Sequence, residues 1–144
     1  SQGFAGRARR PALAELKAAV PVPVFGSGDL FTADDALAMA EETGVDAGMI
    51  ARGTLGNPFI FAEIRARIEG RDLRVGARER LDTAMRHLEM EAGAKGEAVA
   101  CREMRKHFVA YTKGMEGGAA LRQAVVHAAT IARYRELVED YLRR

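Results

Sequence analysis

The chain has 144 residues, 48% of them hydrophobic, and a formal net charge of +2. That length fits one domain or two small ones and excludes a complete (β/α)8 barrel, which needs roughly 250 residues. The single cysteine, Cys101, excludes an internal disulfide and a cysteine-rich zinc site, and no apolar run is long enough for a transmembrane helix or a secretory signal. We therefore expect a globular protein of a reducing, cytoplasmic compartment, with no membrane contact and no metal site.

The first part of the chain alternates helical and β-rich segments. A helix is predicted over 11–19, and the apolar run 22–25 then leads into the sequence Gly-Ser-Gly-Asp at 26–29. Thr32 and Asp35 have the spacing of a capping box, so the next helix is expected to begin there. Its apolar positions indicate that one side of this helix faces a core.

A second β-rich run, 47–51, ends in the pair Arg52-Gly53. Asn57 and Pro58 suit the cap and the first position of a third helix, because proline is favoured at the first helical position. The order strand, helix, strand, helix, with short connections, is typical of βαβ units and a parallel sheet.

After residue 75 the pattern is wholly helical. Apolar residues recur every three or four positions over 77–93, 97–112 and 118–142, and glycine-containing turns separate these stretches. A small helical bundle is therefore predicted, with the boundary between the two parts of the chain near 70–77.

The ends of the two predicted strands are the strongest local feature. Parallel strands place both ends at the same edge of a sheet, where Gly28 and Gly53 let a ligand approach the backbone and Arg52 adds a charge. This pattern favours a phosphate site, although glycines also simply make turns. Asp29 either contacts the ligand or caps the following helix, and the residues alone leave both interpretations open.

Basic residues are concentrated in the helical part. Residues 75–144 carry 13 Lys and Arg against 10 Asp and Glu, and this surplus is densest within 102–122. The patch is either a phosphate-backbone surface or a solvated helix face.

The histidines occur singly, with no metal-ligand spacing and no recognisable catalytic arrangement. Tyr111 either stacks on a base or belongs to the core. Cys101 lies at helical spacing from Met104, which favours a buried core residue over a nucleophile.

Taken together, these motifs resemble the tRNA-dihydrouridine synthases, and the B-type bacterial branch in particular. The first part resembles the end of that family's barrel, and the opening Gln2-Gly3-Phe4-Ala5-Gly6 resembles the loop before its seventh helix. Residues 102–122 resemble the family's C-terminal helical domain. The motifs that carry the resemblance are Val24-Phe25-Gly26-Ser27-Gly28-Asp29-Leu30, Asp34-Asp35-Ala36, Thr43-Gly44-Val45-Asp46, Met49-Ile50-Ala51-Arg52-Gly53 and Leu55-Gly56-Asn57-Pro58-Phe59-Ile60-Phe61, with Arg102-Glu103-Met104-Arg105-Lys106-His107, Tyr111, Lys113-Gly114 and Arg122.

The resemblance implies an α/β segment over residues 1–74, the last two βα units of an FMN-binding (β/α)8 TIM barrel, and an all-α, tRNA-binding helical domain over residues 75–144. It implies an oxidoreductase in which NADPH reduces FMN, and the flavin passes a hydride to C6 of a uridine in tRNA. Ser27 stands where the family commonly has Asn, and Ala51 where it commonly has Gly. The residues expected to hold FMN are Ser27, Gly28, Asp29, Ala51, Arg52 and Gly53. Those expected to contact tRNA are Arg102, Arg105, Lys106, His107, Lys113 and Arg122.

The family's catalytic cysteine and a flavin-contacting lysine lie upstream of the motifs found here, so the resemblance implies no catalytic residue in this chain. The first residue is Ser1 and not Met, so we expect a fragment. Because that cysteine is missing, the fragment is expected to be inactive alone. Its first part is expected to need the missing barrel, or a second copy, to cover its strand edges. Two alternatives remain: another FMN barrel, such as a relative of dihydroorotate dehydrogenase, and a non-enzymatic RNA-binding module formed by 77–144.

Overall fold

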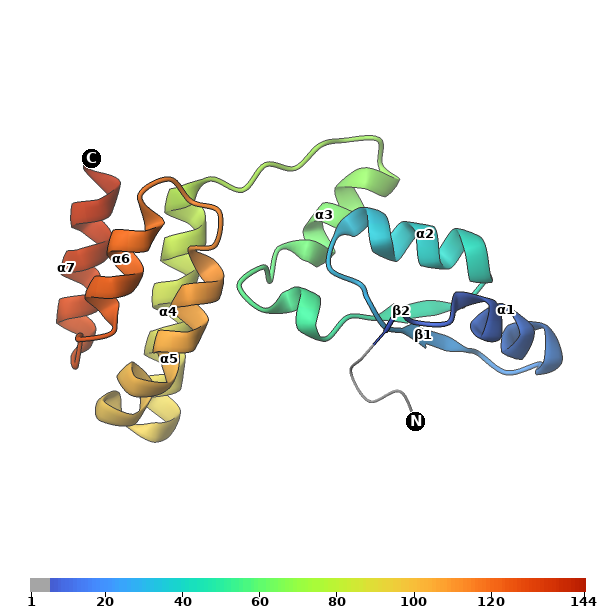
Figure 1. Ribbon diagram of the computed structural model, residues 1–144, viewed down its shortest axis with the longest axis horizontal. Helices are drawn as coiled ribbons and strands as arrows, with labels where there is room; N and C mark the ends of the chain where they lie inside the picture. The colour runs from blue at the N-terminus through green and yellow to red at the C-terminus, as the bar shows by residue number, and fades with distance from the viewer. Residues whose placement is uncertain (1–5) are drawn as a thin grey trace. The chain divides into compact units, whose positions relative to one another are not determined.

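The computed structural model describes residues 6–144, so Gln2 to Ala5 of the opening motif lie outside the described residues. The described chain is mostly helical with a two-stranded parallel sheet (Figure 1). Its contacts divide it into two compact units, the first reaching to Thr54 and including Pro58–Leu73, the second comprising Leu55–Asn57 and Arg74–Arg144. None of the helices in 6–144 has both the length and the apolar character needed to cross a membrane.

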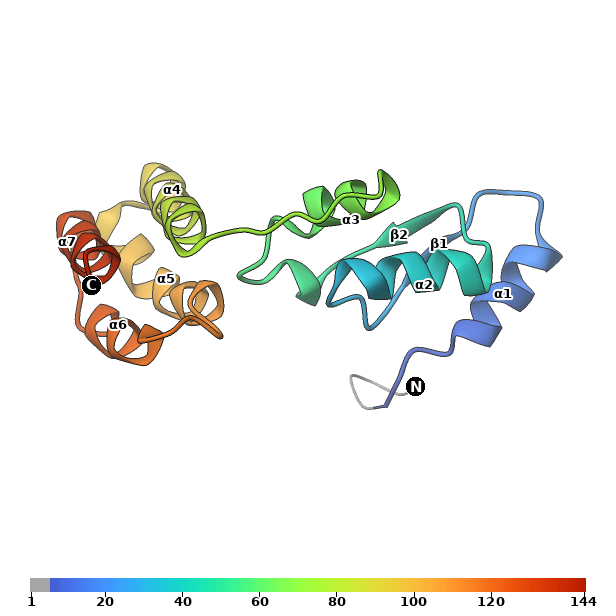
Figure 2. The ribbon, with the colours of Figure 1, turned by 90° about the horizontal axis from the view of Figure 1, so that it is seen from above.

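The first unit carries the sheet. Strands β1 (Phe25–Ser27) and β2 (Ala47–Met49) run parallel, and Ser27 pairs with Met49 where the strands end. Helix α2 packs against both α1 and α3, as Figures 1 and 2 show. The helices of this unit are α1 (Arg10–Ala19), α2 (Ala33–Thr43) and α3 (Ile60–Ile68), with a short 3-10 turn, η1 (Arg52–Thr54), after β2. The parallel pairing agrees with the alternating pattern in the sequence.

Both strands differ from the segments predicted for them. β1 begins only at the last residue of the run 22–25, and β2 stops at Met49 instead of residue 51. Pro23 has no N–H to offer a neighbouring strand, and the Val24 amide donates to the carboxylate of Asp46 at 2.7 Å. The Asp46 amide donates in return to the Val24 carbonyl at 2.9 Å. These two hydrogen bonds between Val24 and Asp46, one of them to a side chain, take the place of strand pairing before β1 begins.

One face of the sheet is covered and the other is open. A Cβ on Gly26 would lie 2.7 Å from Met39 Sδ, so α2 packs directly on the strand backbone at this point. Phe25 and Met49 lie on the opposite face, where they are 69% and 59% exposed. The small core of the unit consists of Val24, Leu30, Met39 and Val45.

The start of α2 follows local rules. Thr32 Oγ1 accepts a hydrogen bond from the Asp35 amide at 3.1 Å, and the Asp35 carboxylate accepts one from the Thr32 amide at 2.9 Å. The predicted capping box is therefore confirmed. The hydrogen bond with the Thr32 side chain is the main reason that the pKa of the Asp35 carboxyl is lowered.

Helix α3 begins later than predicted. Its first helical residue is Ile60 and its cap is Phe59, so the prediction that Asn57 and Pro58 open the helix is wrong. Residues 55–57 pack with the second unit instead, and the chain rejoins the first unit at Pro58.

In the second unit, the helices of residues 74–144 surround one apolar core (Figure 2). They are α4 (Ala77–Lys95), α5 (Glu97–Tyr111), α6 (Gly118–Val125) and α7 (Ile131–Leu142). Phe108 of α5 and Tyr134 of α7 meet edge to face, with ring centroids 4.9 Å apart. The Tyr134 hydroxyl donates to the Cys101 carbonyl at 2.8 Å. Burial raises the pKa of the Cys101 thiol, and its predicted place in the core is confirmed.

The helical stretch predicted over 118–142 is two helices. α6 ends at Val125, and α7 begins after Thr130, whose side chain accepts a hydrogen bond from the Arg133 amide at 3.2 Å. Ala128 lies between the two helices and is buried in the core, so the apolar pattern continues through the break. A capping threonine at this point was the available signal of a new helix.

Candidate functional site

The two strands bring the loops that follow them to one edge of the sheet. Besides pairing with Met49, Ser27 donates a hydrogen bond from its hydroxyl to the Met49 carbonyl at 3.2 Å. Residues 28–29 leave the sheet after β1, and residues 50–53 leave it after β2. The structure thus brings together the two groups of residues that the sequence associated with a cofactor. Their role in binding one stays a prediction.

An ion pair joins the two loops. Asp29 Oδ1 lies 3.5 Å from Arg52 Nη2, and Asp29 Oδ2 accepts a hydrogen bond from the Ala8 amide at 2.7 Å. Asp29 adopts a left-handed backbone conformation, with a φ of 52°, which aims its carboxylate at these partners. Thr32 is the cap of α2, so the interpretation of Asp29 as that cap is wrong. The Arg52 guanidinium carbon lies 5.3 Å from the centre of the Phe31 ring, so the cation is held between a carboxylate and an aromatic face.

Two glycines in these loops are packed closely against other parts of the chain. Gly28 has a φ of +116°, and a Cβ there would lie 2.7 Å from Ala8 Cβ. A Cβ on Gly53 would overlap the Leu30 carbonyl oxygen. Ala51 does not adopt the left-handed conformation, so alanine causes no backbone strain there. Its carbonyl accepts hydrogen bonds from the amide and the hydroxyl of Thr54, at 3.1 and 2.8 Å, which close the η1 turn.

An open hollow of about 670 Å³ lies beside Asp29. Arg7, Arg10 and Phe31 also line it. Arg10 is held by its neighbours, since it donates to the Glu42 carboxylate at 2.9 Å and to a backbone carbonyl of α2 at 3.3 Å. The hollow offers a ligand space next to the loop that follows β1. Arg7 and Arg10 were not found by sequence reasoning, because they come from a segment about twenty residues before Asp29 in the chain.

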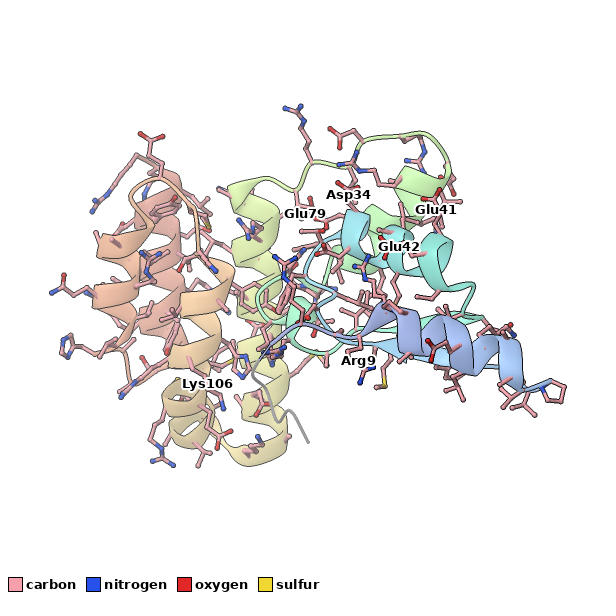
Figure 3. The ribbon with its side chains drawn as sticks, turned by 45° about the vertical axis from the view of Figure 1, so that its right-hand side comes forward. Arg9, Asp34, Glu41, Glu42, Glu79 and Lys106 are labelled. Carbon is pink, nitrogen blue, oxygen red and sulfur yellow. The ribbon has the colours of Figure 1, made fainter. Side chains whose placement is uncertain are left out.

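Three of the predicted RNA-contacting residues are exposed cations. Arg102 and Lys106 lie one helical turn apart on α5, and Lys113 lies in the turn after that helix. Figure 3 labels Lys106 on the surface of α5. Within the described part of the chain, none of the three is bound in an ion pair. These side chains are therefore available to contact an anion.

Two other residues predicted to contact tRNA lie against other parts of the helical unit. Arg122 Nη1 donates to the carbonyl of the buried Thr112 at 3.0 Å, which ties α6 to the end of α5. Arg105 is half-buried close to Tyr134, and its Nε has no hydrogen-bond partner among the described residues. Burial raises the pKa of Tyr134 to about 12, against the opposing effect of Arg105.

His107 is half-buried beside a second imidazole. Its ring centre lies 4.9 Å from that of His87 on α4, and the Tyr111 hydroxyl lies 3.5 Å from His87 Nδ1. Burial is the main cause that lowers the pKa of His107, and the nearby His87 and Lys106 lower it further. Tyr111 is only 5% exposed, which favours its interpretation as a core residue. Nothing in the sequence pairs His87 with His107, because the two lie on different helices.

Comparison with known proteins places the chain in a family. The model of the family described as Dihydrouridine synthase (Dus) matches residues 1–144, the whole chain. A protein of Treponema pallidum named "Probable tRNA-dihydrouridine synthase" is 41% identical over 145 residues, which cover 97% of this chain and 43% of that protein.

Two further relatives agree with this match. "Probable tRNA-dihydrouridine synthase 1" of Synechocystis is 36% identical over 97% of this chain and 40% of its own length. "tRNA-dihydrouridine synthase B" of Xanthomonas campestris is 32% identical over 97% of this chain and 43% of its own length. The chain thus spans about two fifths of the length of these curated relatives.

Proposed function

The chain belongs to the dihydrouridine synthase family, and from that premise we propose that it forms part of a cytoplasmic, FMN-dependent tRNA-dihydrouridine synthase. That enzyme reduces uridine to 5,6-dihydrouridine in tRNA with NADPH. In this proposal residues 1–74 are the last two βα units of a TIM barrel, and residues 75–144 are a helical tRNA-binding domain. The parallel sheet supports the first assignment, and the shared core of α4–α7 supports the second.

The observation that carries the proposal is the Asp29–Arg52 ion pair at the edge of the sheet. The Arg52 side chain is 51% exposed, so it can donate to a phosphate while Asp29 and Phe31 keep it in place. This donor fits the phosphate of FMN. When bound, FMN supplies the hydride that reduces the uracil ring. The residues that would hold it are Ser27, Gly28, Asp29, Ala51, Arg52 and Gly53.

The exposed cations of the second unit support docking of tRNA. Arg102, Lys106 and Lys113 can neutralise phosphates without first breaking an ion pair within the described residues. Arg105, His107 and Arg122 lie nearer the helix contacts, and we propose that they shape this surface. We assign no catalytic residue in the chain.

The open face of the first unit supports a further part of the proposal. Phe25 and Met49 expose large apolar side chains on a short sheet whose outer edges have no strand partner among residues 6–144. Such a sheet is stable only when another layer covers it. We propose that the rest of a barrel, or a second copy of this chain, covers that face.

The decisive experiment uses the protein purified at its natural full length. We expect visible flavin absorbance, and loss of uridine from tRNA when NADPH is added. Arg52→Gln should weaken flavin retention, whereas Arg133→Gln, which removes a cation of α7, should leave it unchanged. Protein without flavin, and tRNA without loss of uridine, would contradict the proposal. Binding of tRNA without any flavin would instead identify a non-enzymatic RNA-binding module.

A further inference from the structure

Two imidazoles face each other where α4 and α5 pack together, inside the second unit. The ring centres of His87 and His107 lie 4.9 Å apart, and the ring planes are inclined by 56°. Both side chains are half-buried. The Tyr111 hydroxyl lies 3.5 Å from His87 Nδ1, whereas the His107 ring makes no hydrogen bond within the described residues. His107 therefore has a ring nitrogen that can take up a proton.

The charged groups that act on His107 come from both helices. Glu91 of α4 and Glu103 of α5 each lie one helical turn from a histidine, and Lys95 bridges them, with its Nζ 2.8 and 2.9 Å from the two carboxylates. Burial is the main cause that lowers the pKa of His107, and the neighbouring imidazole and Lys106 lower it further, while the two carboxylates raise it. The net effect is a lowered pKa, so the His107 ring is neutral at neutral pH.

Lys106 connects this pair with the exposed cations of α5. It precedes His107 in the chain, is exposed, and forms no ion pair within the described residues. Its ammonium opposes protonation of His107, because like charges repel. A phosphate bound at Lys106 would offset this repulsion and place a negative charge close to the imidazole. Binding of a phosphate and binding of a proton therefore favour each other.

We infer that the His87–His107 pair is a proton-binding site coupled to anion binding on α5: an RNA phosphate that docks at Lys106 is bound together with a proton at the pair. The inference rests on the proposed function for its ligand, the phosphate backbone of tRNA. Because coupling between two sites is reciprocal, tRNA should bind more tightly as pH falls through the range in which the pair takes up its proton. Two charged imidazoles at 4.9 Å would repel each other, so the pair takes up one proton in this range and not two.

Fluorescence anisotropy with a labelled, unmodified tRNA transcript tests this coupling at fixed ionic strength. The 144-residue chain suits the test, because its three histidines are His87, His107 and His127. From about pH 7.5 to about pH 5.5 we expect the affinity of the wild type to rise about tenfold, which equals a tenfold gain in the proton affinity of the pair when RNA is bound. His107→Gln should reduce this rise to less than about threefold, because the imidazole that takes up the proton is gone.

His127→Gln is the matched control, because His127 is exposed and follows the end of α6, away from the pair in the chain. This variant should keep the wild-type rise in affinity. Equal wild-type affinity at the two pH values, or a full rise in His107→Gln, would overturn the inference and leave the proposed docking of tRNA intact. Absence of tRNA binding at both pH values would contradict the docking surface as well, so the two failures are distinguishable.

Calorimetry of the wild-type chain decides the matter if His107→Gln does not fold. The heat of tRNA binding, measured in buffers that differ in their heat of ionisation, gives the number of protons taken up on binding. Near about pH 6.5 we expect uptake of about half a proton per chain, both in the wild type and in His127→Gln. No uptake in the wild type, or uptake that disappears in His127→Gln, would overturn the inference.

Discussion

Removing the exposed cations of α5 should weaken tRNA binding in a way that salt reveals. Arg102 and Lys106 are separated by about 6 Å along the helix, from the rise of 1.5 Å per residue, and Lys113 continues the positive surface beyond the helix end. If all three contact phosphates, the triple variant Arg102→Gln, Lys106→Gln, Lys113→Gln loses three counterion-releasing contacts. The three substitutions remove charge without creating a buried cavity, because these side chains are exposed.

The expected magnitude follows from counterion release. Each phosphate neutralised contributes about 0.9 to the slope of log affinity against log salt on a duplex, and about 0.7 on a single strand. The triple variant should therefore have a slope smaller by about 2 to 3. When salt rises from about 50 to 200 mM, both proteins lose affinity, and the fold-loss of the wild type should be roughly 20 to 40 times larger than that of the triple variant. Fluorescence anisotropy with labelled tRNA over this salt range measures both slopes.

A matched triple variant separates this surface from overall charge. Arg133, Arg135 and Arg143 of the α7 region are also exposed, but each is in an ion pair, with Glu136, Glu89 and Asp140 respectively. Their replacement by Gln removes the same charge, at little cost in stability because exposed ion pairs contribute little. We expect a nearly unchanged salt slope. Equal slopes for the two triple variants, or a wild-type slope in the α5 variant, would refute the assignment of tRNA contacts to α5.

Three further predictions concern the fold. Phe108→Ala removes a fully buried ring packed on Tyr134 and should cost about 3–5 kcal/mol in urea unfolding, and a cost below about 1 kcal/mol would contradict the described core. Cys101 should react with a thiol reagent far more slowly in the native chain than in urea, because its side chain is 1% exposed; equal rates would contradict its burial. Asp46→Asn tests a carboxyl whose pKa is lowered first by the hydrogen bond from Lys17 and then by the Val24 amide. Its stabilising effect is complete above the ordinary carboxyl pKa of about 4 and is lost as pH falls through the lower folded value, so the variant should be less stable than wild type at neutral pH and equal to it in strong acid. A stability gap that does not change with pH would count against this role.

Local features of the fold could be predicted from the sequence because their causes lie within a few residues. The capping box of Thr32 and Asp35 spans one helical turn, and its two residue types are sufficient to specify it. The order of the elements predicted parallel strands, and parallel strands end at the same edge of a sheet, as β1 and β2 do. Both predictions needed only the pattern of neighbours along the chain.

Features that depend on distant partners could not be predicted in this way. Asp29 was a candidate from its position after a strand, but its hydrogen bond comes from Ala8, and the two are separated by 21 residues. The start of β1 differs from the prediction because the Asp46 side chain accepts the hydrogen bond of the Val24 amide, a contact that no periodicity encodes. The break between α6 and α7 was hidden because Ala128 continues the apolar pattern through it.

The glycines at the strand ends show why the cofactor hypothesis should be tested through Arg52. Gly26 makes room for Met39, Gly28 combines a positive φ with contact to Ala8, and Gly53 makes room for a carbonyl. Each glycine is therefore accounted for by the protein's own packing, with no ligand required. The Asp29–Arg52 pair is different, because it leaves about half of the Arg52 side chain exposed at the edge of the sheet, beside a carboxylate and an aromatic ring. A cation at an exposed edge, kept near its partners, is what a phosphate site needs, so substitution of Arg52 tests the site more directly than substitution of a glycine.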